Sequence, residues 1–413
     1  MASEKTDVPG IENVLPQNIA AVEDSVQPAR LDDARLRVLQ VITHLDMGGA
    51  ESIAMSLIDG LRSRIDFSLF AILQHAEPGA VGRDMAARLD QWIVPVNFGV
   101  TGRFKSGGAV VAAYRLAREI RRFRPDVVHL HAEIAELTFS IAVFLSRAAR
   151  IAPVLRTVHN STLWIDWNRL GNGVTTVLAT ADAVAVSRNA ADADAAIVTL
   201  RKRPRCDVIY NGVPRPKPDS SRAGVQANGP FRVLFAGRLV HQKGADLLPA
   251  ILAEAYRLTE RRDVCVTIAG SGVLQEAVEQ GLADQLDGWN VSIEPPISGL
   301  ANHLNDYDAV LLPSRYEGFA LLPLEVLMAG VPLVTTMAPG LDEALPPSYP
   351  LASPVDNVTA LGERLASVIN GDEDYRAMAA RCGDELAQRF SPAAMAQAYA
   401  ERYRRLAARV RAR

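Results

Sequence analysis

The sequence predicts an α/β protein made of two doubly wound, Rossmann-like domains, each built on a parallel sheet, that face a cleft. With 413 residues the chain is too long for one ordinary domain of about 100–200 residues. Short apolar runs alternate with helical patterns along most of its length, which is typical of βαβ units. The alternation is interrupted once, by a polar, proline-rich stretch over residues 214–230 that has the composition of an interdomain linker.

Composition and charge narrow the class of protein. The chain is 49% hydrophobic and 22% charged, as ordinary globular proteins are. Its net charge of -3 gives no general attraction to nucleic acid, so no nucleic-acid partner is expected. Three cysteines without metal-like spacing favour a reducing compartment over a disulfide scaffold or a zinc site. We find neither an apolar span of about 18 residues nor a secretion signal, and therefore expect a cytoplasmic protein.

The apolar pattern also sets the expected domain boundaries. Residues 1–34 have no sustained periodicity and are rich in acidic residues, proline and glutamine, which predicts a disordered tail. An N-terminal domain is expected over 35–213, a C-terminal domain over 231–390, and a C-terminal helix over 391–413 that could pack back on the N-terminal domain. Strands are expected at 38–42, 67–73, 127–131, 154–159, 183–187 and 207–210, and then at 231–236, 264–269, 291–294, 309–312 and 332–336.

Polar residues and glycines follow directly after many of these strands. In open parallel sheets, ligands bind in the crevice beyond the carboxyl ends of the strands. We therefore expect a ligand between the domains. His129, by contrast, is expected to point away from His131 and to pack in the core. The strand-end positions are 44–49, His131, His159, 187–188, 211–212, 237–238, 270–272 and Glu317.

Two of these segments have features suited to phosphate. Arg238 and Lys243 lie five residues apart and would combine a planar fork with a compact point charge, which could stabilise a departing diphosphate. Gly48 and Gly49 precede a predicted helix, whose N-terminus favours an anion. For the cation pair, an ordinary surface loop remains the alternative. The glycine pair lacks the third glycine of the dinucleotide-binding fingerprint.

Two glutamates, Glu317 and Glu325, stand eight positions apart around a Gly-Phe step. Glu317 is expected in the loop after the strand at 309–312, and Glu325 in the early turns of a helix over 321–329. A buried or half-buried carboxylate is costly unless a ligand or partner satisfies it. Either the pair serves a ligand or both residues are solvated surface glutamates.

Taken together, these motifs resemble the family 4 retaining glycosyltransferases of the GT-B fold, also called glycosyl transferases group 1. The resemblance covers residues 37 to 390 and depends on the joint order of the motifs, since each one alone is common. The matching pieces are Gly-Gly-Ala-Glu at 48–51, Asp-Val-Val-His-Leu-His at 126–131, Thr-Val-His-Asn at 157–160, Ile-Tyr-Asn-Gly-Val at 209–213, Gly-Arg-Leu-Val-His-Gln-Lys-Gly at 237–244, Ile-Ala-Gly-Ser-Gly at 268–272, and the two glutamates with their seven-residue spacer.

The resemblance implies transfer of a sugar from a nucleotide-diphosphate sugar to a glycan or lipid-linked acceptor, in cell-surface or exopolysaccharide synthesis. The α-linkage would be retained by front-face attack, with the leaving phosphate as base. Arg238 and Lys243 would neutralise the diphosphate, so neither a metal nor another cofactor would be required. Glu325 would accept the two ribose hydroxyls.

Further site residues follow from the same resemblance. Glu317 and His159 would lie near the transferred sugar, and Gly318 and Phe319 would turn backbone amides toward the sugar or the phosphate. The glycines expected at the donor are Gly48, Gly49 and Gly270. The sequence departs from its relatives after residue 339, where a proline-rich turn replaces a glycine-rich one and Glu343 is the residue that matches the usual acidic position.

Other functions remain open at this stage. A catalytically weak, nucleotide-sugar-binding partner subunit would keep Arg238, Lys243 and Glu325 but could lose the acceptor side. A dehydrogenase would need the three-glycine fingerprint, and a periplasmic binding protein would need a signal peptide.

A basic amphipathic stretch over 114–124 predicts peripheral attachment to an anionic membrane surface, at the inner face of the cell membrane. Its apolar stripe consists of Leu116, Ile120 and Phe123. The equal alternative is that this stripe packs on the sheet and leaves a solvated basic face.

Overall fold

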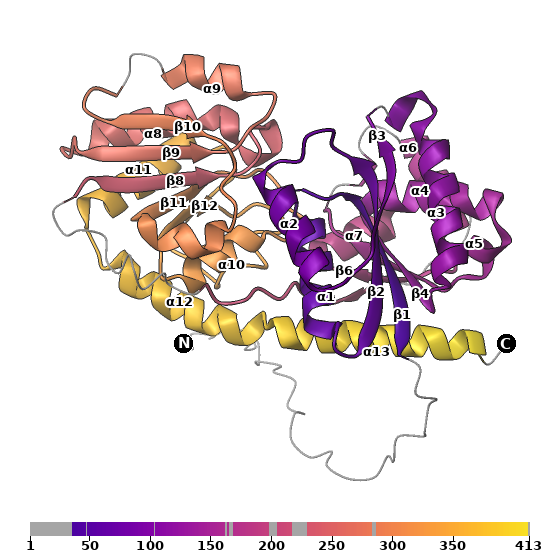
Figure 1. Ribbon diagram of the computed structural model, residues 1–413. Coiled ribbons are helices and arrows are strands. Elements are labelled where there is room, and N and C mark those ends of the chain that lie inside the picture. The colour runs from indigo at the N-terminus through magenta and orange to yellow at the C-terminus, as the bar shows by residue number, and fades with distance from the viewer. Residues whose placement is uncertain are drawn as a thin grey trace, which may run out of the picture. The chain divides into compact units, whose positions relative to one another are not determined.

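Two parallel sheets form the framework of the protein in a computed structural model (Figure 1). The structure describes residues 35–46, 48–102, 104–161, 163–164, 168–197, 205–216, 229–282 and 286–411. The predicted tail at 1–34 and most of the predicted linker, residues 217–228, lie outside these ranges. Residues 35–413 form one unit, so contacts between the two domains belong to a single body.

The strand orders confirm the predicted fold class. The first sheet runs β3-β2-β1-β4-β5-β6-β7 and the second β10-β9-β8-β11-β12-β13, with parallel pairing throughout both. The chain order reverses between β1 and β4 and again between β8 and β11, which makes these the switch points where ligands bind in such folds. The strands are β1 Leu36–His44, β2 Ile65–Gln74, β3 Val96–Thr101, β4 Val127–His131, β5 Val154–Val158, β6 Asp182–Ala185, β7 Asp207–Val208, β8 Phe231–Ala236, β9 Val264–Ala269, β10 Asn290–Glu294, β11 Ala309–Leu312, β12 Leu333–Thr336 and β13 Ala352–Ser353.

The sequence did not predict two of the described strands, β3 and β13, and both lie at a sheet edge. β3 carries asparagine, glycine and threonine among its six residues, and β13 has only two residues. An edge strand pairs on one side only, so it needs less apolar sequence than a central strand covered on both faces. The central strands were predicted because they are covered on both faces and therefore have long apolar sequences. An example is β1, which has five consecutive buried residues.

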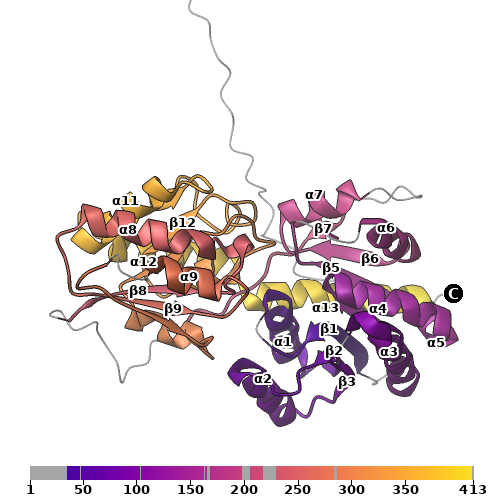
Figure 2. The same ribbon diagram turned by 90° about the horizontal axis from the view of Figure 1, so that it is seen from above.

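Helices cover both sheets, since the connections between parallel strands must cross a face. On the first sheet, α3 and α4 share one core, and α1 belongs to another. On the second, α8 packs with α11 (Figure 2), while α10 packs with α12. The helices are α1 Gly49–Leu61, α2 Ala80–Gln91, α3 Ala109–Phe123, α4 Ala132–Leu145, α5 Arg147–Ile151, α6 Asn168–Val177, α7 Arg188–Ala196, α8 Leu248–Leu258, α9 Gln275–Leu282, α10 Leu321–Met328, α11 Val358–Asn370, α12 Tyr375–Arg389 and α13 Pro392–Arg411, with short turns η1 Phe104–Gly108, η3 His241–Lys243, η4 Ala245–Leu247 and η5 Leu300–Asp306.

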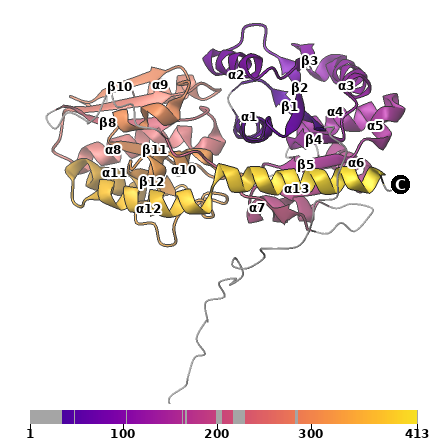
Figure 3. The same ribbon diagram turned by 60° about the horizontal axis from the view of Figure 1, so that its bottom comes forward.

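The last helix, α13, returns from the second domain to the first (Figure 3). Tyr399 and Tyr403 are fully buried in the core that α1 shares with β1 and β2. Where α13 begins, the backbone amide of Gly212 donates to Sδ of Met395 at 3.1 Å, and that of Val213 donates to the carbonyl of Phe390 at 3.0 Å. The chain passes between the domains twice, once near residue 213 and once near residue 391. These two segments are hydrogen-bonded to each other.

The apolar stripe of α3 is part of the core. Leu116 and Ile120 are buried beneath the helix, and Phe123 packs on the same core. This decides the alternative left open by the sequence: the stripe packs on the sheet, so it cannot be a lipid-facing surface. The basic residues of α3, such as Arg118 and Arg121, are exposed.

One prediction about β4 is wrong. His129 was expected to point away from His131, but their ring centroids lie only 4.0 Å apart. Residues two positions apart on a strand share a face, because successive side chains alternate. The expected burial of His129 is confirmed, since none of its surface is exposed.

Candidate functional site

The structure brings Lys243 and Glu317 together at the carboxyl ends of β8 and β11. Nζ of Lys243 lies 2.6 Å from Oε1 of Glu317, and Oγ of Ser314 donates to the same oxygen at 2.8 Å. Arg238, in the same loop as Lys243, is exposed, and among the described residues it donates only to the side chain of Gln242, at 3.1 Å. The loop after β8 thus presents one cation held by a buried glutamate and one exposed cation.

This loop is held against the end of β11 by contacts that sequence reasoning missed. Gly244 has a φ of +67°, and a Cβ there would overlap the carbonyl oxygen of Pro313. Arg315 forms two parallel bonds of 2.7 Å to Asp246, and it donates to the carbonyl of His241 at 2.6 Å. Arg315 also lowers the pKa of Asp246. The position of Lys243 is therefore built into the packing of the two strand ends.

Glu325 lies in α10, as predicted, and is half-buried. Its carboxylate has no hydrogen-bond or ion-pair partner among the described residues, and burial raises its pKa to about 7. A half-buried carboxylate without a partner costs folding free energy. It is therefore a good candidate for ligand recognition.

Gly48 and Gly49 lead into α1, where Glu51 folds back over the loop. A Cβ on Gly48 would overlap the Glu51 carboxylate, whereas nothing lies near a Cβ on Gly49. Burial raises the pKa of Glu51, and the charges of His44 and Arg238 oppose the shift. The influence of Arg238 on Glu51 places the loop after β8 near the N-terminus of α1.

Gly270 has a structural explanation of its own. A Cβ at this position would overlap the carbonyl oxygen of Gly237, and its amide donates to the carbonyl of Glu294 at 2.9 Å. The close packing of the ends of β8 and β9 requires a glycine here, whether or not a ligand also approaches it.

The segment from Glu317 to Phe319 docks directly on the first domain. A Cβ on Gly318 would overlap the carbonyl oxygen of His159. Ser161 donates to the carbonyl of Glu317 at 2.7 Å, and Ser187 donates to that of Gly318 at 2.6 Å.

The backbone amides of Gly318 and Phe319 donate to no other described residue. Both carbonyls of the 317–318 step are thus engaged by the first domain, while two successive amides remain available. The side chain of Phe319 has a different role, because it is buried beside Tyr210 and Phe390, with ring centroids 5.7 and 5.2 Å away.

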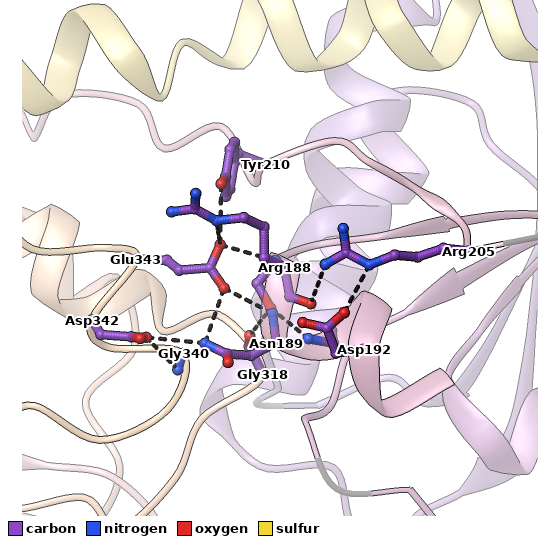
Figure 4. A network of polar contacts seen from close by, with 11 residues as sticks. Arg188, Asn189, Asp192, Arg205, Tyr210, Gly318, Gly340, Asp342 and Glu343 are labelled. Carbon is purple, nitrogen blue, oxygen red and sulfur yellow. Dashed lines mark hydrogen bonds and ion pairs between the residues drawn. The ribbon is translucent and has the colours of Figure 1, made fainter. Parts of the chain in front are cut away.

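Glu343 joins the two domains at the N-terminus of α7 (Figure 4). Its buried carboxylate accepts the backbone amides of Arg188 at 2.8 Å and Asn189 at 2.9 Å, and the hydroxyl of Tyr210 at 3.0 Å. Arg188 and Asn189 add side-chain bonds at 3.3 and 3.0 Å. A helix N-terminus favours a negative charge, so this contact is electrostatically well matched. The sequence singled out Glu343 only through its resemblance to relatives.

His159 stands at the end of β5, beside the docked segment. It is 8% exposed, and burial lowers its pKa to about 3, so the ring is neutral. Its Nε2 lies 3.0 Å from Nδ1 of His131. Within the described ranges, no group of three or more His, Cys, Asp and Glu side chains is placed to hold a metal ion.

Comparison with known proteins agrees with this architecture. The family model "Glycosyltransferase Family 4" matches residues 47–215, and "Glycosyl transferases group 1" matches residues 217–383. A glycogen synthase of Mycobacterium tuberculosis is 30% identical over 246 residues, 54% of this chain and 55% of that protein. A D-inositol 3-phosphate glycosyltransferase of Arthrobacter is 31% identical over 143 residues, 33% of each chain. The matched region thus spans about half the length, or less, of these relatives.

Solved structures share the fold across nearly the whole chain. Anabaena HepE in complex with UDP-glucose has a TM-score of 0.72 at 19% identity, covering 89% of this chain and 99% of HepE. Sucrose-phosphate synthase of Thermosynechococcus elongatus has a TM-score of 0.70 at 17% identity, covering 91% of this chain and all of that one (100%). With two consecutive family models matching its two domains, the chain belongs to family 4 of the glycosyltransferases with the GT-B fold.

Proposed function

We propose that this protein is a retaining hexosyltransferase that moves a sugar from a nucleotide-diphosphate sugar to a glycan or lipid-linked acceptor. The observation that carries the proposal is the Lys243–Glu317 pair, set beside His159 of the other domain. The pair sets an ammonium group next to a segment that touches both domains, and we propose that this cation meets the leaving group. We further propose a role in cell-surface or exopolysaccharide synthesis, in keeping with the acceptor class.

The donor would bind along the ends of β8 and β11. Arg238 and Lys243 would take the diphosphate, helped by the available amides of Gly318 and Phe319. The unpaired carboxylate of Glu325 would accept both ribose hydroxyls, which supplies the partners it otherwise lacks. HepE was crystallised with UDP and glucose and with UDP-glucose, so UDP-sugars are the first donors to test.

The proposed reaction is a front-face substitution at the anomeric carbon. The bond from this carbon to the diphosphate oxygen breaks, and its electron pair leaves with the diphosphate. The acceptor oxygen forms the new bond on the same face, and its proton passes to the leaving phosphate oxygen. The α-linkage is kept, and the products are a glycoside and a nucleoside diphosphate.

Charge on the departing diphosphate is the main electrostatic demand of this reaction. Two fixed cations at the site would meet that demand in the way that a metal ion does in other enzymes. We therefore propose that transfer needs no metal or other cofactor, and that the rate persists in the presence of a chelator. Glu317 would serve by holding Lys243 in place, since it lies 2.6 Å from the ammonium nitrogen.

The alternative is a nucleotide-sugar-binding subunit with little turnover. A two-stage experiment separates the two functions. A panel of UDP- and GDP-sugars is first screened for thermal stabilisation, because binding to the native state raises its apparent stability. The stabilising donor, radiolabelled, is then incubated with the protein and with acceptor extract, with and without EDTA. Product that depends on the extract supports the transferase, whereas binding without product supports the subunit.

The cation pair yields a first prediction. Arg238→Ala and Lys243→Ala are each expected to lower kcat by at least about a hundredfold, on the scale of losing one transition-state donor. Arg381→Ala, at an exposed position on α12, is the matched control and should keep the wild-type rate. Wild-type-like turnover in folded variants at position 238 or 243 would remove that residue from the site.

Glu325→Gln is expected to change stability and binding in opposite directions. Burial raises the pKa of Glu325 from 4.5 to about 7 in the native state. The free energy of unfolding therefore falls as pH rises through this range, because the unfolded state loses the proton first. The neutral variant avoids this cost, so above pH 7 its melting temperature should exceed that of the wild type by about 2 °C or more, and below pH 4.5 the difference should vanish.

The same variant should bind the nucleotide more weakly, because a neutral amide is a poorer acceptor than a carboxylate. Calorimetry at a pH above 7 would measure this, with Glu260→Gln at an exposed position as control. Unchanged nucleotide affinity would contradict the assignment of Glu325 to the ribose.

We also propose that the protein attaches to an anionic membrane surface, but through a different surface from the stripe of α3. Phe144, Leu145 and Ile151 are exposed by 69, 49 and 68% at the junction of α4 and α5. The exposed Arg147 and Arg150 lie in the same segment, and Arg150 donates to the carbonyl of Phe144 at 3.4 Å. Apolar side chains beside cations are suited to the interface of an anionic bilayer. No described helix is long and apolar enough to span a membrane.

This surface predicts a salt-sensitive interaction. Sedimentation with anionic vesicles should pellet the wild type at low salt and release it at high salt, because salt screens the arginines. The double variant Phe144→Ser with Ile151→Ser should stay in the supernatant. Val273→Ser, which alters another highly exposed apolar side chain, should pellet like the wild type. Failure of the wild type to pellet at low salt would rule out the proposed contact.

A further inference from the structure

A chain of buried polar side chains links the C-terminal helix α13 to His159. It lies on the face of the first sheet that α13 covers (Figure 3), because the register pairs Gln40 with His129 and His131 with Thr157. Its buried members are all 0% exposed: Gln40, His129, His131, Thr157, Tyr399 and Tyr403. Burying so many polar groups is costly unless every one is hydrogen-bonded.

The bonds form one continuous path between His159 and Tyr399. From His159 the path runs through His131 and Gln40 to Tyr403, and from there through His129 and Thr157. The distances are 3.0 Å from His159 Nε2 to His131 Nδ1, 2.7 Å from His131 Nε2 to Gln40 Oε1, 3.2 Å from Gln40 Nε2 to Tyr403 Oη, 2.7 Å from Tyr403 Oη to His129 Nδ1, 2.7 Å from His129 Nε2 to Thr157 Oγ1, and 3.1 Å from Thr157 Oγ1 to Tyr399 Oη.

The amide of Gln40 gives this path a direction. Burial lowers the pKa of all three histidines below the ordinary range, so each neutral ring has one donor and one acceptor nitrogen. The Gln40 carbonyl can only accept, so Nε2 of His131 must carry the proton. Nδ1 of His131 is then an acceptor, and Nε2 of His159 must donate to it.

The same reasoning applies to the bonds on the other side of Gln40, from Tyr403 to Tyr399. The Gln40 amide nitrogen donates to Tyr403, whose hydroxyl proton is then available to Nδ1 of His129. Nε2 of His129 in turn donates to the hydroxyl of Thr157, which is hydrogen-bonded to the hydroxyl of Tyr399. Each bond has one donor and one acceptor. Reversal of the bond between His131 and His159 would require the Gln40 amide to flip.

We propose that this network holds His159 in the tautomer protonated at Nε2, and that Gln40 and Tyr403 are positioning residues acting through His131. Nδ1 of His159 has no hydrogen-bond partner among the described residues. In this tautomer it offers a lone pair, which selects a hydroxyl group that donates to the ring. The assignment of this hydroxyl to the sugar donor or to the acceptor rests on the proposed function. The tautomer of His159 is independent of that function.

Nitrogen-15 NMR of the full-length, histidine-labelled protein tests the tautomer directly. The signals of His159 are identified by their loss in His159→Asn. We expect a protonated-type shift at Nε2 and an unprotonated-type shift at Nδ1. The reverse assignment, or an averaged pair of shifts, would overturn the proposal.

Gln40→Glu is a nearly isosteric test of direction. A carboxylate only accepts, so the Tyr403 hydroxyl must donate to it and can no longer donate to His129. Nδ1 of His129 must then donate to Tyr403, while His131 and His159 keep their protons in place. A switch confined to His129 is expected. An unchanged His129, or a switch of His159, would contradict the network.

The two tyrosines of α13 form a matched pair for function. Both are fully buried and stand four positions apart, and each would lose only its hydroxyl on change to phenylalanine. Tyr403→Phe frees the Gln40 amide to flip, so we expect mixed tautomers of His159 and a kcat lower by about tenfold at unchanged nucleotide affinity. Tyr399→Phe affects only the end of the network that is most distant from His159 along the path. This variant should keep the tautomer of His159 and a kcat within about twofold of the wild type.

The readouts separate the two proposals. Absence of transfer with every donor would contradict the proposed function, while the NMR shifts would still report on the network. A Tyr403→Phe variant with a single His159 tautomer and wild-type kcat would overturn the positioning role. Equal losses from both tyrosine variants would also overturn it, because they would show a general effect of disturbing α13.

Discussion

One buried carboxylate, that of Glu343, bonds the second domain to the strand ends of the first. Glu343 would be costly in this position without partners, but the N-terminus of α7 provides two backbone amides, and Tyr210 adds a hydroxyl. Removing one partner from such a buried, hydrogen-bonded charge typically costs about 2–5 kcal/mol. The contact therefore ties the turn after β12 firmly to α7. The neighbouring segment 317–319 can then meet His159 and Ser187 in a defined register.

That register has chemical consequences for the site. Both carbonyls of the 317–318 step are used by serine hydroxyls of the first domain, while the amides of Gly318 and Phe319 remain available. The second domain contributes Lys243, already oriented by Glu317, and the exposed Arg238. Positive charge and free donors thus collect on one side of the domain junction, and the neutral ring of His159 lies on the other. This polarity suits an anionic leaving group held against a neutral sugar.

Two polar groups that lack a partner among the described residues lie in the same region. Glu325 is half-buried without a partner, and Nδ1 of His159 has none among the described residues. By contrast, the buried polar groups between β1, β4, β5 and α13 are bonded throughout. A fully satisfied network specifies one arrangement of its side chains, whereas unsatisfied groups at a site await a ligand.

The sequence by itself determined the two parallel sheets, most of their strands and the strand-end positions of Arg238, Lys243, His159 and Glu317. Apolar periodicity and chain direction are local properties, so these features could be predicted from short segments of the sequence. Only the tertiary structure decided which partners each side chain meets. Glu343 and Arg188 are 155 positions apart, and Tyr403 and His129 are 274 apart. It also placed the stripe of α3 in the core. Burial and pairing across such separations depend on the packing of whole elements, which no local pattern encodes.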